Sequence, residues 1–381
     1  MNPSPALSCA PRERIVVRGV NWLGDAVMST PALQRLRNAQ PEAHITLLTH
    51  AKLADLWRHH PAIDDVLTFQ DGESVFAVAR KLRAENFSTA LVLPNSPRSG
   101  LEVFLARIPR RIGVARSWRN FLLTTRVPPL PGIQEMRKRS KQEIAKLARM
   151  DDELPIRSGK GDYDSAPHQL HHYLHLATAL GASAEVLPPW LEVTETEVAA
   201  VKDRFGCGSG ARLFGLNAGA EYGPAKRWPR ERFVNAAIEL QRRTSCHWWV
   251  FGGKADEALA SGIAAEIVAA KAGPVDSVRC LVGQTSLREL CAALKACELV
   301  ITNDTGPMHV AAAVGTPVIV PFGSTSPELT GPGLPGDARH QLIKSPVPCS
   351  PCFRRECPID FRCMNSITVE MIVEAAMKVI R

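Results

Sequence analysis

The chain reads Leu299-Val-Ile-Thr-Asn-Asp-Thr-Gly-Pro-Met-His309 where a short apolar run passes into a polar loop. The run predicts a buried strand at Leu299–Asn303, and a helix at Met308–Val314 is predicted directly after it. The unpaired N–H groups and the positive dipole end of such a helix form an anion site. Asp304 in the loop can accept hydrogen bonds from sugar hydroxyls. The alternative is a purely structural turn, which would seldom need Asp304, Thr305 and His309 together.

The same order of strand, loop and helix recurs on both sides of this stretch. A first series predicts strands at Ile15–Val17, Ile45–Thr49, Val66–Phe69, Ala90–Leu93 and Arg111–Val114. Its predicted helices are Ala32–Asn38, Leu53–His59, Val75–Glu85 and Gly100–Ala106. After Pro188–Pro189, a second series predicts strands at Leu213–Asn217, His247–Phe251, Arg279–Val282 and Val318–Pro321. The helices predicted in this part are Arg230–Arg243, Asp256–Lys271 and Leu287–Ala296.

This alternation predicts the α/β class, with two doubly wound, Rossmann-like domains whose parallel sheets are covered by helices on both faces. Between the two series we expect a basic helix at Met136–Met150, an irregular polar stretch at Asp151–Pro167 and a helix at His168–Leu180. The predicted domains are residues 1–188 and 189–366, and residues 367–381 form a closing helix. Such sheets bind ligands at the carboxyl ends of their strands, so the cleft between the domains is the expected active site.

Composition excludes several classes of protein. The 381 residues are 45% hydrophobic and 22% charged, which is typical of a globular chain and not of a disordered, collagenous or coiled-coil one. The longest uncharged run, Val310–Pro327, is interrupted by glycine and proline, so no transmembrane span is predicted. The N-terminus lacks the basic and apolar regions of a signal peptide, and we therefore expect a cytoplasmic protein.

The positive charge is concentrated in one stretch. The net charge is +8, but Arg98–Arg149 alone holds thirteen basic and three acidic residues. Such a field attracts a polyanion, which could be nucleic acid, an anionic membrane surface or a phosphorylated substrate. A solvated basic face without a partner is the alternative.

Two further loops run from a predicted strand toward a predicted helix. The first, Arg18-Gly-Val-Asn-Trp-Leu-Gly-Asp25, places a carboxylate at a helix start, where Asp25 is either an N-cap or a general base. The second, Ala218-Gly-Ala-Glu-Tyr-Gly-Pro-Ala-Lys226-Arg-Trp-Pro229, combines small residues with a lysine, which suits a diphosphate. A basic loop that only caps the next helix is the alternative for Lys226.

Cysteine and histidine clusters raise the question of a metal. Four thiolates at Cys349, Cys352, Cys357 and Cys363 could form a structural zinc site, although their spacing is not that of a common zinc finger. Free thiols that pack a loop are the alternative in a reducing compartment. For the four histidines between His168 and His175, we favour a hydrogen-bonded or solvated face over a metal site.

Taken together and in this order, four segments resemble the bacterial ADP-heptose:lipopolysaccharide heptosyltransferases of glycosyltransferase family 9. They are Asn21–Asp25, Gly219–Pro229, Asn303–His309 and Cys349–Cys357, and the likeness runs from residue 14 to about residue 380. The second and fourth segments look like the heptosyltransferase II branch, which adds the second core heptose. The resemblance implies a GT-B fold with an N-terminal acceptor domain and a C-terminal ADP-heptose domain. It also implies inverting transfer that requires no metal and no cofactor.

The resemblance also implies roles for individual residues. Asp25 matches the catalytic base, Lys226 matches the phosphate-binding lysine, and Gly219 belongs to the same donor loop. The sugar and phosphate contacts match Asp304, Thr305 and Gly306, with His309 beside them, and Gln284 and Thr285 occupy the loop that faces the adenine. The acceptor-binding residues are expected in the basic stretch, at Arg98, Arg116 and Arg119.

The function implied is transfer of heptose from ADP-L-glycero-D-manno-heptose to the anionic heptosyl-Kdo2-lipid A inner core. Because that acceptor is lipid-anchored, peripheral contact with the inner face of the cytoplasmic membrane is expected. No nucleic acid is expected as a partner. A first-heptose transferase or a sugar-nucleotide epimerase remains an alternative. A basic, zinc-containing nucleic-acid-binding protein would also explain the charge, but it gives no reason for Asn-Asp-Thr-Gly at a strand end.

Overall fold

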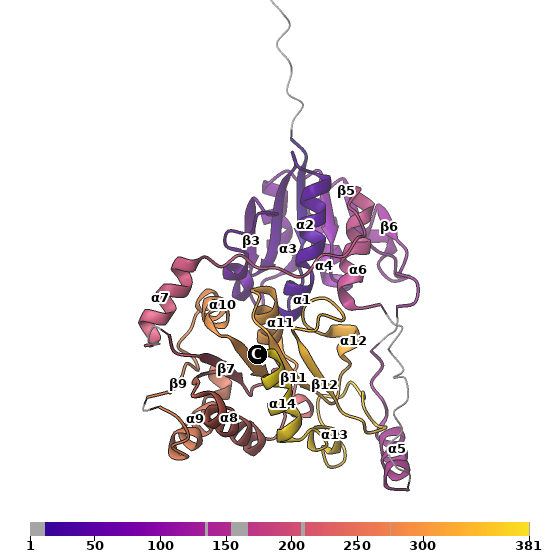
Figure 1. Ribbon diagram of the computed structural model, residues 1–381. Coiled ribbons are helices and arrows are strands. Elements are labelled where there is room, and N and C mark those ends of the chain that lie inside the picture. Colours follow the sequence, from indigo (N-terminus) through magenta and orange to yellow (C-terminus); the bar gives the residue numbers. More distant parts are fainter. Residues whose placement is uncertain (1–11, 134–135, 154–166, 207–209, 275, 381) are drawn as a thin grey trace, which may run out of the picture. The chain divides into compact units, whose positions relative to one another are not determined.

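The computed structural model describes residues 12–133, 136–153, 167–206, 210–274 and 276–380. Its contacts divide the chain into two compact units, each built around one sheet (Figure 1). The described residues of the N-terminal unit are those up to Asn21, Ala32–Leu130 and Tyr173–Glu185. The C-terminal unit comprises Trp22–Pro31, the described part of Pro131–His172, and the described chain from Val186 onward. The domain boundary between residues 188 and 189 stays a prediction.

The N-terminal sheet is six-stranded and fully parallel, in the order β3-β2-β1-β4-β5-β6. Its strands are β1 (Arg14–Arg18), β2 (His44–His50), β3 (Asp65–Phe69), β4 (Thr89–Val92), β5 (Arg110–Val114) and β6 (Thr125–Val127). The crossovers carry α2 (Thr30–Ala39), α3 (Val75–Ala84), α4 (Pro97–Leu105) and the 3-10 helices η1 (Ala51–Trp57) and η2 (Asn120–Leu122). The end of α6 (Gln169–Ala177) and η3 (Thr178–Leu180) belong to the same unit.

The C-terminal sheet repeats this topology, in the order β12-β11-β10-β7-β8-β9. Its strands are β7 (Leu213–Asn217), β8 (His247–Phe251), β9 (Val278–Cys280), β10 (Leu299–Thr302), β11 (Val318–Phe322) and β12 (Gln341–Lys344). The longer helices are α5 (Lys141–Glu153), α7 (Glu195–Phe205), α8 (Arg230–Thr244), α9 (Glu257–Ala269), α10 (Leu287–Ala296), α11 (Gly306–Ala313) and α14 (Val369–Val379). The short ones are α1 (Leu23–Met28), η4 (Pro224–Lys226), η5 (Lys254–Asp256), α12 (Pro327–Thr330) and α13 (Arg362–Asn365).

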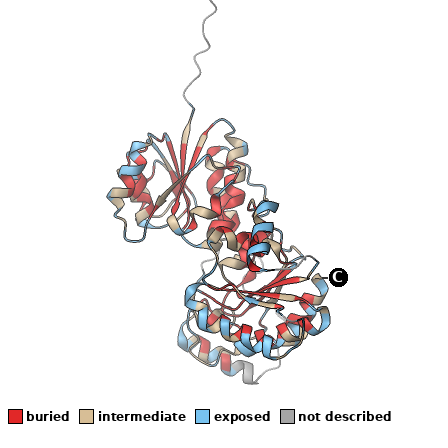
Figure 2. Cartoon of the chain, turned by 90° about the vertical axis from the view of Figure 1, so that its left-hand side faces the viewer, coloured by how far each residue is buried: buried red, intermediate tan, exposed pale blue. Residues whose placement is uncertain are grey.

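Both sheets are buried on their two faces. All residues of β4, β7, β10 and β11 are buried, and Figure 2 shows the strands of each unit mostly in red while the outer faces of the helices are pale blue. Two-sided burial explains why these strands are nearly continuous apolar runs, without the alternation of a half-exposed sheet. Trp248 and Trp249 of β8 point to opposite faces and are both buried, which shows that helices cover each side.

The strand order positions the ligand sites. In each unit the order reverses beside its first strand, between β1 and β4 and between β7 and β10. Doubly wound sheets bind ligands at this switch point, outside the carboxyl ends of the two strands. In the C-terminal unit these ends lead into the Ala218–Pro229 loop and the Asn303–Thr305 turn.

Most predicted elements are present with bounds shifted by one to three residues, but several differ. Leu53–His59 lies mostly in the 3-10 helix η1, and the basic helix begins at Lys141 instead of Met136. Its start is set by Ser140, whose hydroxyl accepts from the Glu143 N–H while the Glu143 carboxylate accepts from the Ser140 N–H. The strands β6 and β12 and the helix α7 were not predicted. Most of the Asp151–Pro167 stretch lies outside the described residues.

Candidate active site

A cavity of about 340 Å³ lies at the switch point of the C-terminal unit, within the usual size range of ligand pockets. Its walls come from α1, the loop after β7, the turn after β10, the loop after β11, and the segment Cys349–Cys357, which we call the cysteine segment. The lining residues are Trp22, Leu23, Gly24, Asp25, Met28, Met136, Glu221, Tyr222, Lys226, Asp304, Thr305, Gly306, His309, Thr325, Thr330, Phe353 and Arg355. The cavity therefore contains the predicted base and most of the predicted donor-binding residues.

A buried ion pair lies in the cavity wall. Lys226 Nζ is 2.6 Å from Asp304 Oδ2, and the two side chains are only 14% and 5% exposed. Thr325 donates its hydroxyl hydrogen to the same carboxylate oxygen. Because Asp304 is held on two sides, it orients the ammonium group of Lys226 at the cavity surface. The alternative that Lys226 belongs to a loop that only caps the next helix does not account for this pairing.

Asn303 joins the two loops that carry this ion pair. Its side-chain amide donates to the Ala218 carbonyl at 2.7 Å, and its side-chain oxygen accepts from the Trp228 N–H at 2.9 Å. Trp228 is itself buried and donates through its indole nitrogen to the Ile367 carbonyl. The loop after β7 is thus fastened to the end of β10, which fixes the position of Lys226 relative to Asp304.

The start of α11 faces the cavity as an anion site. Thr305 is the N-cap in extended conformation, and its side chain makes no capping hydrogen bond. Thr305 and Gly306 both line the cavity. Because Pro307 has no N–H and the Met308 N–H donates to the Thr305 carbonyl, the Gly306 N–H is the first donor of the eight-residue helix at this wall. Uncapped N–H groups and the positive dipole end favour a phosphate at this position.

Two glycines let α1 approach α11 closely. A Cβ atom on Gly24 would lie 2.7 Å from His309 Cδ2, and one on Gly306 would lie 2.9 Å from the Leu23 side chain. This close packing places Asp25, on the first turn of α1, in the same cavity as Lys226. The N-cap of α1 is Trp22, so the alternative that Asp25 is the N-cap is wrong.

His309 is a neutral group in the cavity wall. It is 5% exposed, and burial lowers the pKa of its imidazole to about 3. The nearby Asp304 carboxylate opposes this shift of the pKa, while His168 and Lys226 add to it. At neutral pH His309 can therefore donate or accept a hydrogen bond with a ligand, but it cannot contribute a positive charge.

Sequence reasoning missed Arg355 and Tyr222. Lys226 Nζ lies 5.0 Å and the Arg355 guanidinium carbon 5.2 Å from the centre of the Tyr222 ring, and the Tyr222 hydroxyl donates to the Phe353 carbonyl. The Ala225 N–H donates to the Arg355 carbonyl at 3.0 Å, so the cysteine segment is bound to the donor loop. Arg355 is a second cation in the cavity wall. Its only signal in the sequence was the basic pair within the cysteine motif.

Three predicted donor-binding residues do not line this cavity. Gly219 is buried, and a Cβ atom there would meet the Asp256 carboxylate, so this glycine permits close approach of two loops. Gln284 is exposed and donates to the Cys280 carbonyl at 2.8 Å, with Thr285 next to it. They follow β9 at the edge of the sheet, and their predicted contact with adenine stays a prediction.

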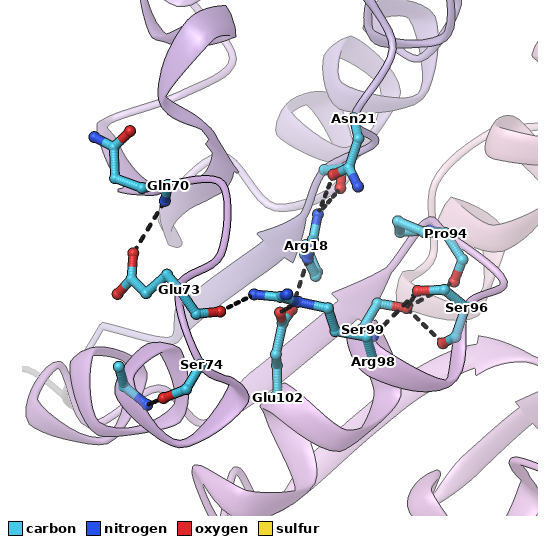
Figure 3. Close-up of polar contacts among 12 residues, drawn as sticks. Arg18, Asn21, Gln70, Glu73, Ser74, Pro94, Ser96, Arg98, Ser99 and Glu102 are labelled. Carbon is cyan, nitrogen blue, oxygen red and sulfur yellow. Dashed lines mark hydrogen bonds and ion pairs between the residues drawn. The ribbon is translucent and has the colours of Figure 1, made fainter.

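Arg98 belongs to a charge network at the switch point of the N-terminal unit (Figure 3). Glu102, fully buried, accepts from Arg18 Nε at 2.8 Å and from Arg98 Nε at 2.9 Å. Arg98 also donates to the Glu73 carbonyl and keeps 40% of its side chain exposed. The Glu102 carboxylate is thus shared by two guanidinium groups, those of Arg18 and Arg98 (Figure 3).

Arg116 and Arg119 lie in the crossover from β5 to β6 and differ in exposure. Arg116 is half-buried, and its N–H donates to the Asn120 side chain. Arg119 is fully buried against Gly100 and Gly113, donates to the Pro94 carbonyl, and has a lowered guanidinium pKa because of burial. A fully buried side chain does not suit direct contact with an acceptor. Arg119 therefore supports the crossover in this structure.

The four cysteines pack a loop. Cys349 and Cys352 lie against Ile144 in a small apolar cluster, and Cys363 lies beside Gly323. Burial raises the pKa of Cys349 to about 11 and that of Cys363 to about 12. Within the described part of the chain, no three His, Cys, Asp or Glu side chains are arranged to hold a metal ion. These described side chains do not fit the zinc site that was one of the two alternatives for the cysteines, and their burial favours the other alternative, thiols that pack a loop.

His168, directly before α6, and His175 within it each bond to a backbone carbonyl of a segment distant in sequence. His168 bonds to the Gly331 carbonyl at 3.0 Å, and burial lowers the pKa of its imidazole to about 4 although this hydrogen bond opposes the shift. His175 bonds to the Pro128 carbonyl. These contacts agree with a hydrogen-bonded histidine face.

Comparisons with known proteins extend the likeness to nearly the whole chain. The family model of glycosyltransferase family 9 (heptosyltransferase) matches residues 75–361. Lipopolysaccharide heptosyltransferase 2 of Salmonella typhimurium is 30% identical over 333 residues, which cover 84% of this chain and 85% of that protein. The enzyme of the same name from Escherichia coli is 29% identical over the same shares.

Solved structures agree with this assignment. The structure of the Escherichia coli ADP-heptose lipopolysaccharide heptosyltransferase II has a TM-score of 0.73, 25% identity, and coverage of 97% of this chain and 98% of that chain. A family 9 glycosyltransferase from Veillonella parvula has a TM-score of 0.74 at 22% identity, covering 97% of each chain, and supports the fold. These matches confirm the predicted α/β, GT-B fold class. Because the family model covers most of the sequence, the chain belongs to glycosyltransferase family 9, the heptosyltransferases, and it is a glycosyltransferase.

Proposed function

We propose that this enzyme transfers heptose from ADP-L-glycero-D-manno-heptose to the heptosyl-Kdo2-lipid A inner core of lipopolysaccharide, with inversion at the anomeric carbon. The observation that carries the proposal is one cavity lined by a carboxylate, Asp25, a cation, Lys226, and the uncapped start of α11. The names of the similar proteins, lipopolysaccharide heptosyltransferase 2, favour the second heptose over the first.

The donor's diphosphate would lie between Lys226, Arg355 and the N–H groups of Thr305 and Gly306. As the bond between the anomeric carbon and the diphosphate oxygen breaks, negative charge grows on that oxygen. Cations and helix N–H groups placed there in advance stabilise the leaving group. Asp304 is available to sugar hydroxyls through the carboxylate oxygen that Lys226 and Thr325 do not bind. Gln284 and Thr285 remain the proposed adenine contacts.

Asp25 would act as the general base. Its carboxylate accepts the proton of the acceptor hydroxyl while that oxygen forms the new bond to the anomeric carbon, and ADP leaves with the electron pair. The acceptor's phosphates and carboxylates would bind the N-terminal domain, with Arg98 and Arg116 as direct contacts and Arg119 as their support. In this scheme residues 1–188 bind the acceptor, residues 189–366 bind the donor, and residues 367–381 close the chain.

We propose that no metal or cofactor is required, because Lys226, Arg355 and the start of α11 supply positive charge for a diphosphate. Transfer should therefore proceed in the presence of EDTA. Complete loss of activity that Mg²⁺ restores would contradict this part of the proposal.

A transfer assay with radiolabelled donors tests the function. Purified enzyme is offered ADP-, GDP- and UDP-linked sugars with Kdo2-lipid A or heptosyl-Kdo2-lipid A. We expect label in the lipid product only with ADP-heptose and the heptosylated acceptor. Product from Kdo2-lipid A would indicate a first-heptose transferase. Conversion of the donor sugar without any acceptor would indicate an epimerase.

A further inference from the structure

Two large aromatic side chains protrude from the crossover between β5 and β6. Trp118 is 46% exposed and Phe121 is 69% exposed. The Arg119 N–H donates to the Arg116 carbonyl and the Leu122 N–H to the Arg119 carbonyl, so this segment forms tight turns in which residues three apart share a face. Arg119 and Leu122 are buried against Gly100 of α4, which leaves Trp118 and Phe121 together on the outer face.

A third aromatic side chain extends this surface onto α4. Phe104 is 39% exposed, and the guanidinium carbon of Arg111 lies 5.4 Å from the centre of its ring. Arg111 also donates to the Leu122 carbonyl at 2.8 Å, next to Phe121. We call Phe104, Trp118 and Phe121 the aromatic patch.

The surroundings of the aromatic patch are positively charged. From Val103 to Gln134 the sequence contains six arginines and no acidic residue. Arg107, next to Phe104, and Arg126, which donates to the Asn120 carbonyl beside Phe121, are both exposed. The patch thus combines exposed rings with cations in a segment of chain that carries no carboxylate.

We propose that the aromatic patch and its arginines bind the surface of an anionic phospholipid bilayer. Aromatic rings are favoured at the depth of lipid headgroups, and each basic residue near an anionic leaflet adds electrostatic attraction. We favour a bilayer over a protein partner because Arg107 and Arg126 are exposed in a segment, residues 103–134, that contains no carboxylate, and such an excess of positive charge suits an anionic surface. The purpose of this contact rests on the proposed function, since the acceptor is anchored in a membrane.

The first test measures binding to vesicles without any substrate. Wild-type enzyme is sedimented with vesicles of phosphatidylcholine alone or with about 30% phosphatidylglycerol, and binding is compared with that of Trp118→Ser/Phe121→Ser. We expect wild-type binding only to the anionic vesicles, and a partition coefficient at least about tenfold lower for the double variant. Arg107→Gln and Arg126→Gln should each weaken binding about fivefold, and added salt should weaken the wild type.

Phe76 provides a matched control. It is 74% exposed on α3. Three basic residues follow it within seven positions, but the nearby carboxylates offset their charge, unlike in the segment 103–134; these acidic residues are Asp71, Glu73 and Glu85. Phe76→Ser removes a similar exposed ring and should leave vesicle binding within about twofold of wild type. Equal binding by wild type and the double variant, or no binding of wild type to anionic vesicles, would overturn the proposal.

A second measurement separates the membrane proposal from the proposed function. The double variant should transfer heptose to a deacylated, soluble acceptor at the wild-type rate, because the aromatic patch touches only lipid. A parallel loss with the soluble acceptor would overturn the proposal and place the rings in the acceptor site or the fold. Conversely, vesicle binding by an enzyme that transfers no heptose would support the membrane surface while the proposed function fails. The single variant Phe121→Ser, at the most exposed ring of the aromatic patch, repeats the test with the least effect on folding.

Discussion

Replacing Lys226 by methionine should weaken donor binding while largely preserving the shape of the cavity. Methionine keeps the unbranched stem of lysine and removes its charge. A hydrogen bond to a charged group contributes about 1.5–3 kcal/mol, and at an effective dielectric constant of about 20 two unit charges 4 Å apart interact by about 4 kcal/mol. Asp304, whose carboxylate lies 2.6 Å from the ammonium, offsets part of that attraction. We therefore expect ADP affinity to fall by about 1.5–2.5 kcal/mol, or roughly 10- to 70-fold.

The same substitution should also destabilise the fold, and a second variant separates the two effects. Lys226→Met leaves Asp304 buried with Thr325 as its remaining partner from this set, and removal of one member of a buried ion pair costs about 3–5 kcal/mol. Lys226→Met/Asp304→Asn removes both charges, so the unfolding free energy should recover most of the loss. Its affinity for ADP should stay low, because the cation that binds the diphosphate is still missing.

The measurements are calorimetric titration with ADP and urea unfolding of each variant. Arg227→Met is the matched control, because Arg227 is the adjacent cation, is 43% exposed, pairs with Asp256 at 3.6 Å and does not line the cavity. It should change ADP affinity by less than about threefold. A folded Lys226→Met enzyme that binds ADP within threefold of wild type would refute the reasoning and leave Lys226 as a structural partner of Asp304.

Four more results are expected. Asp25→Asn should lower kcat by roughly 10²–10⁴-fold with unchanged ADP affinity, and wild-type turnover would reduce Asp25 to a first-turn helix residue. Arg355→Ala should weaken ADP binding about tenfold in calorimetry, since it removes a cavity cation, and unaltered affinity would leave Arg355 a loop-packing residue. Burial lowers the pKa of His60 to about 4, so the unfolded chain takes up this proton first as the pH falls, and the unfolding free energy should decrease between pH 6.5 and 4. His60→Asn should make that decrease shallower in urea unfolding, and an identical slope would show that the pKa of His60 is the same in the folded and the unfolded chain. Iodoacetamide at pH 8 should label Cys349 and Cys363 at least about 100-fold more slowly than free cysteine by peptide mass spectrometry, whereas rapid labelling, or one zinc per chain by elemental analysis, would contradict packing by protonated thiols.

The sequence by itself determined the class of fold, because burial on both faces of a parallel sheet leaves a strong local pattern. Most predicted strands are apolar runs that are buried in the structure, from Ile15–Val17 to Val318–Pro321, whereas the predicted edge strands β3 and β9 are mostly half-buried or exposed. The two short edge strands that were not predicted leave a weaker apolar pattern in the sequence, because β12 has no buried residue and β6 has one. The helix α7 had a readable start, the capping box formed by Thr194 and Glu197, and its weak amphipathic pattern explains why it was missed.

The motifs that resemble the family also identified the loops that form the candidate active site, since Asp25, Lys226 and Asp304 all line one cavity. Only the tertiary structure decided which residues complete or leave that site. Arg355 enters it because the backbone of the cysteine segment bonds to Ala225, more than a hundred residues away in sequence. Arg119 was expected to contact the acceptor, and charged residues such as Glu102 are mostly exposed in proteins, yet both side chains are fully buried. Charge, spacing and periodicity are local properties of a sequence, whereas burial and pairing depend on which distant segments the fold brings into contact.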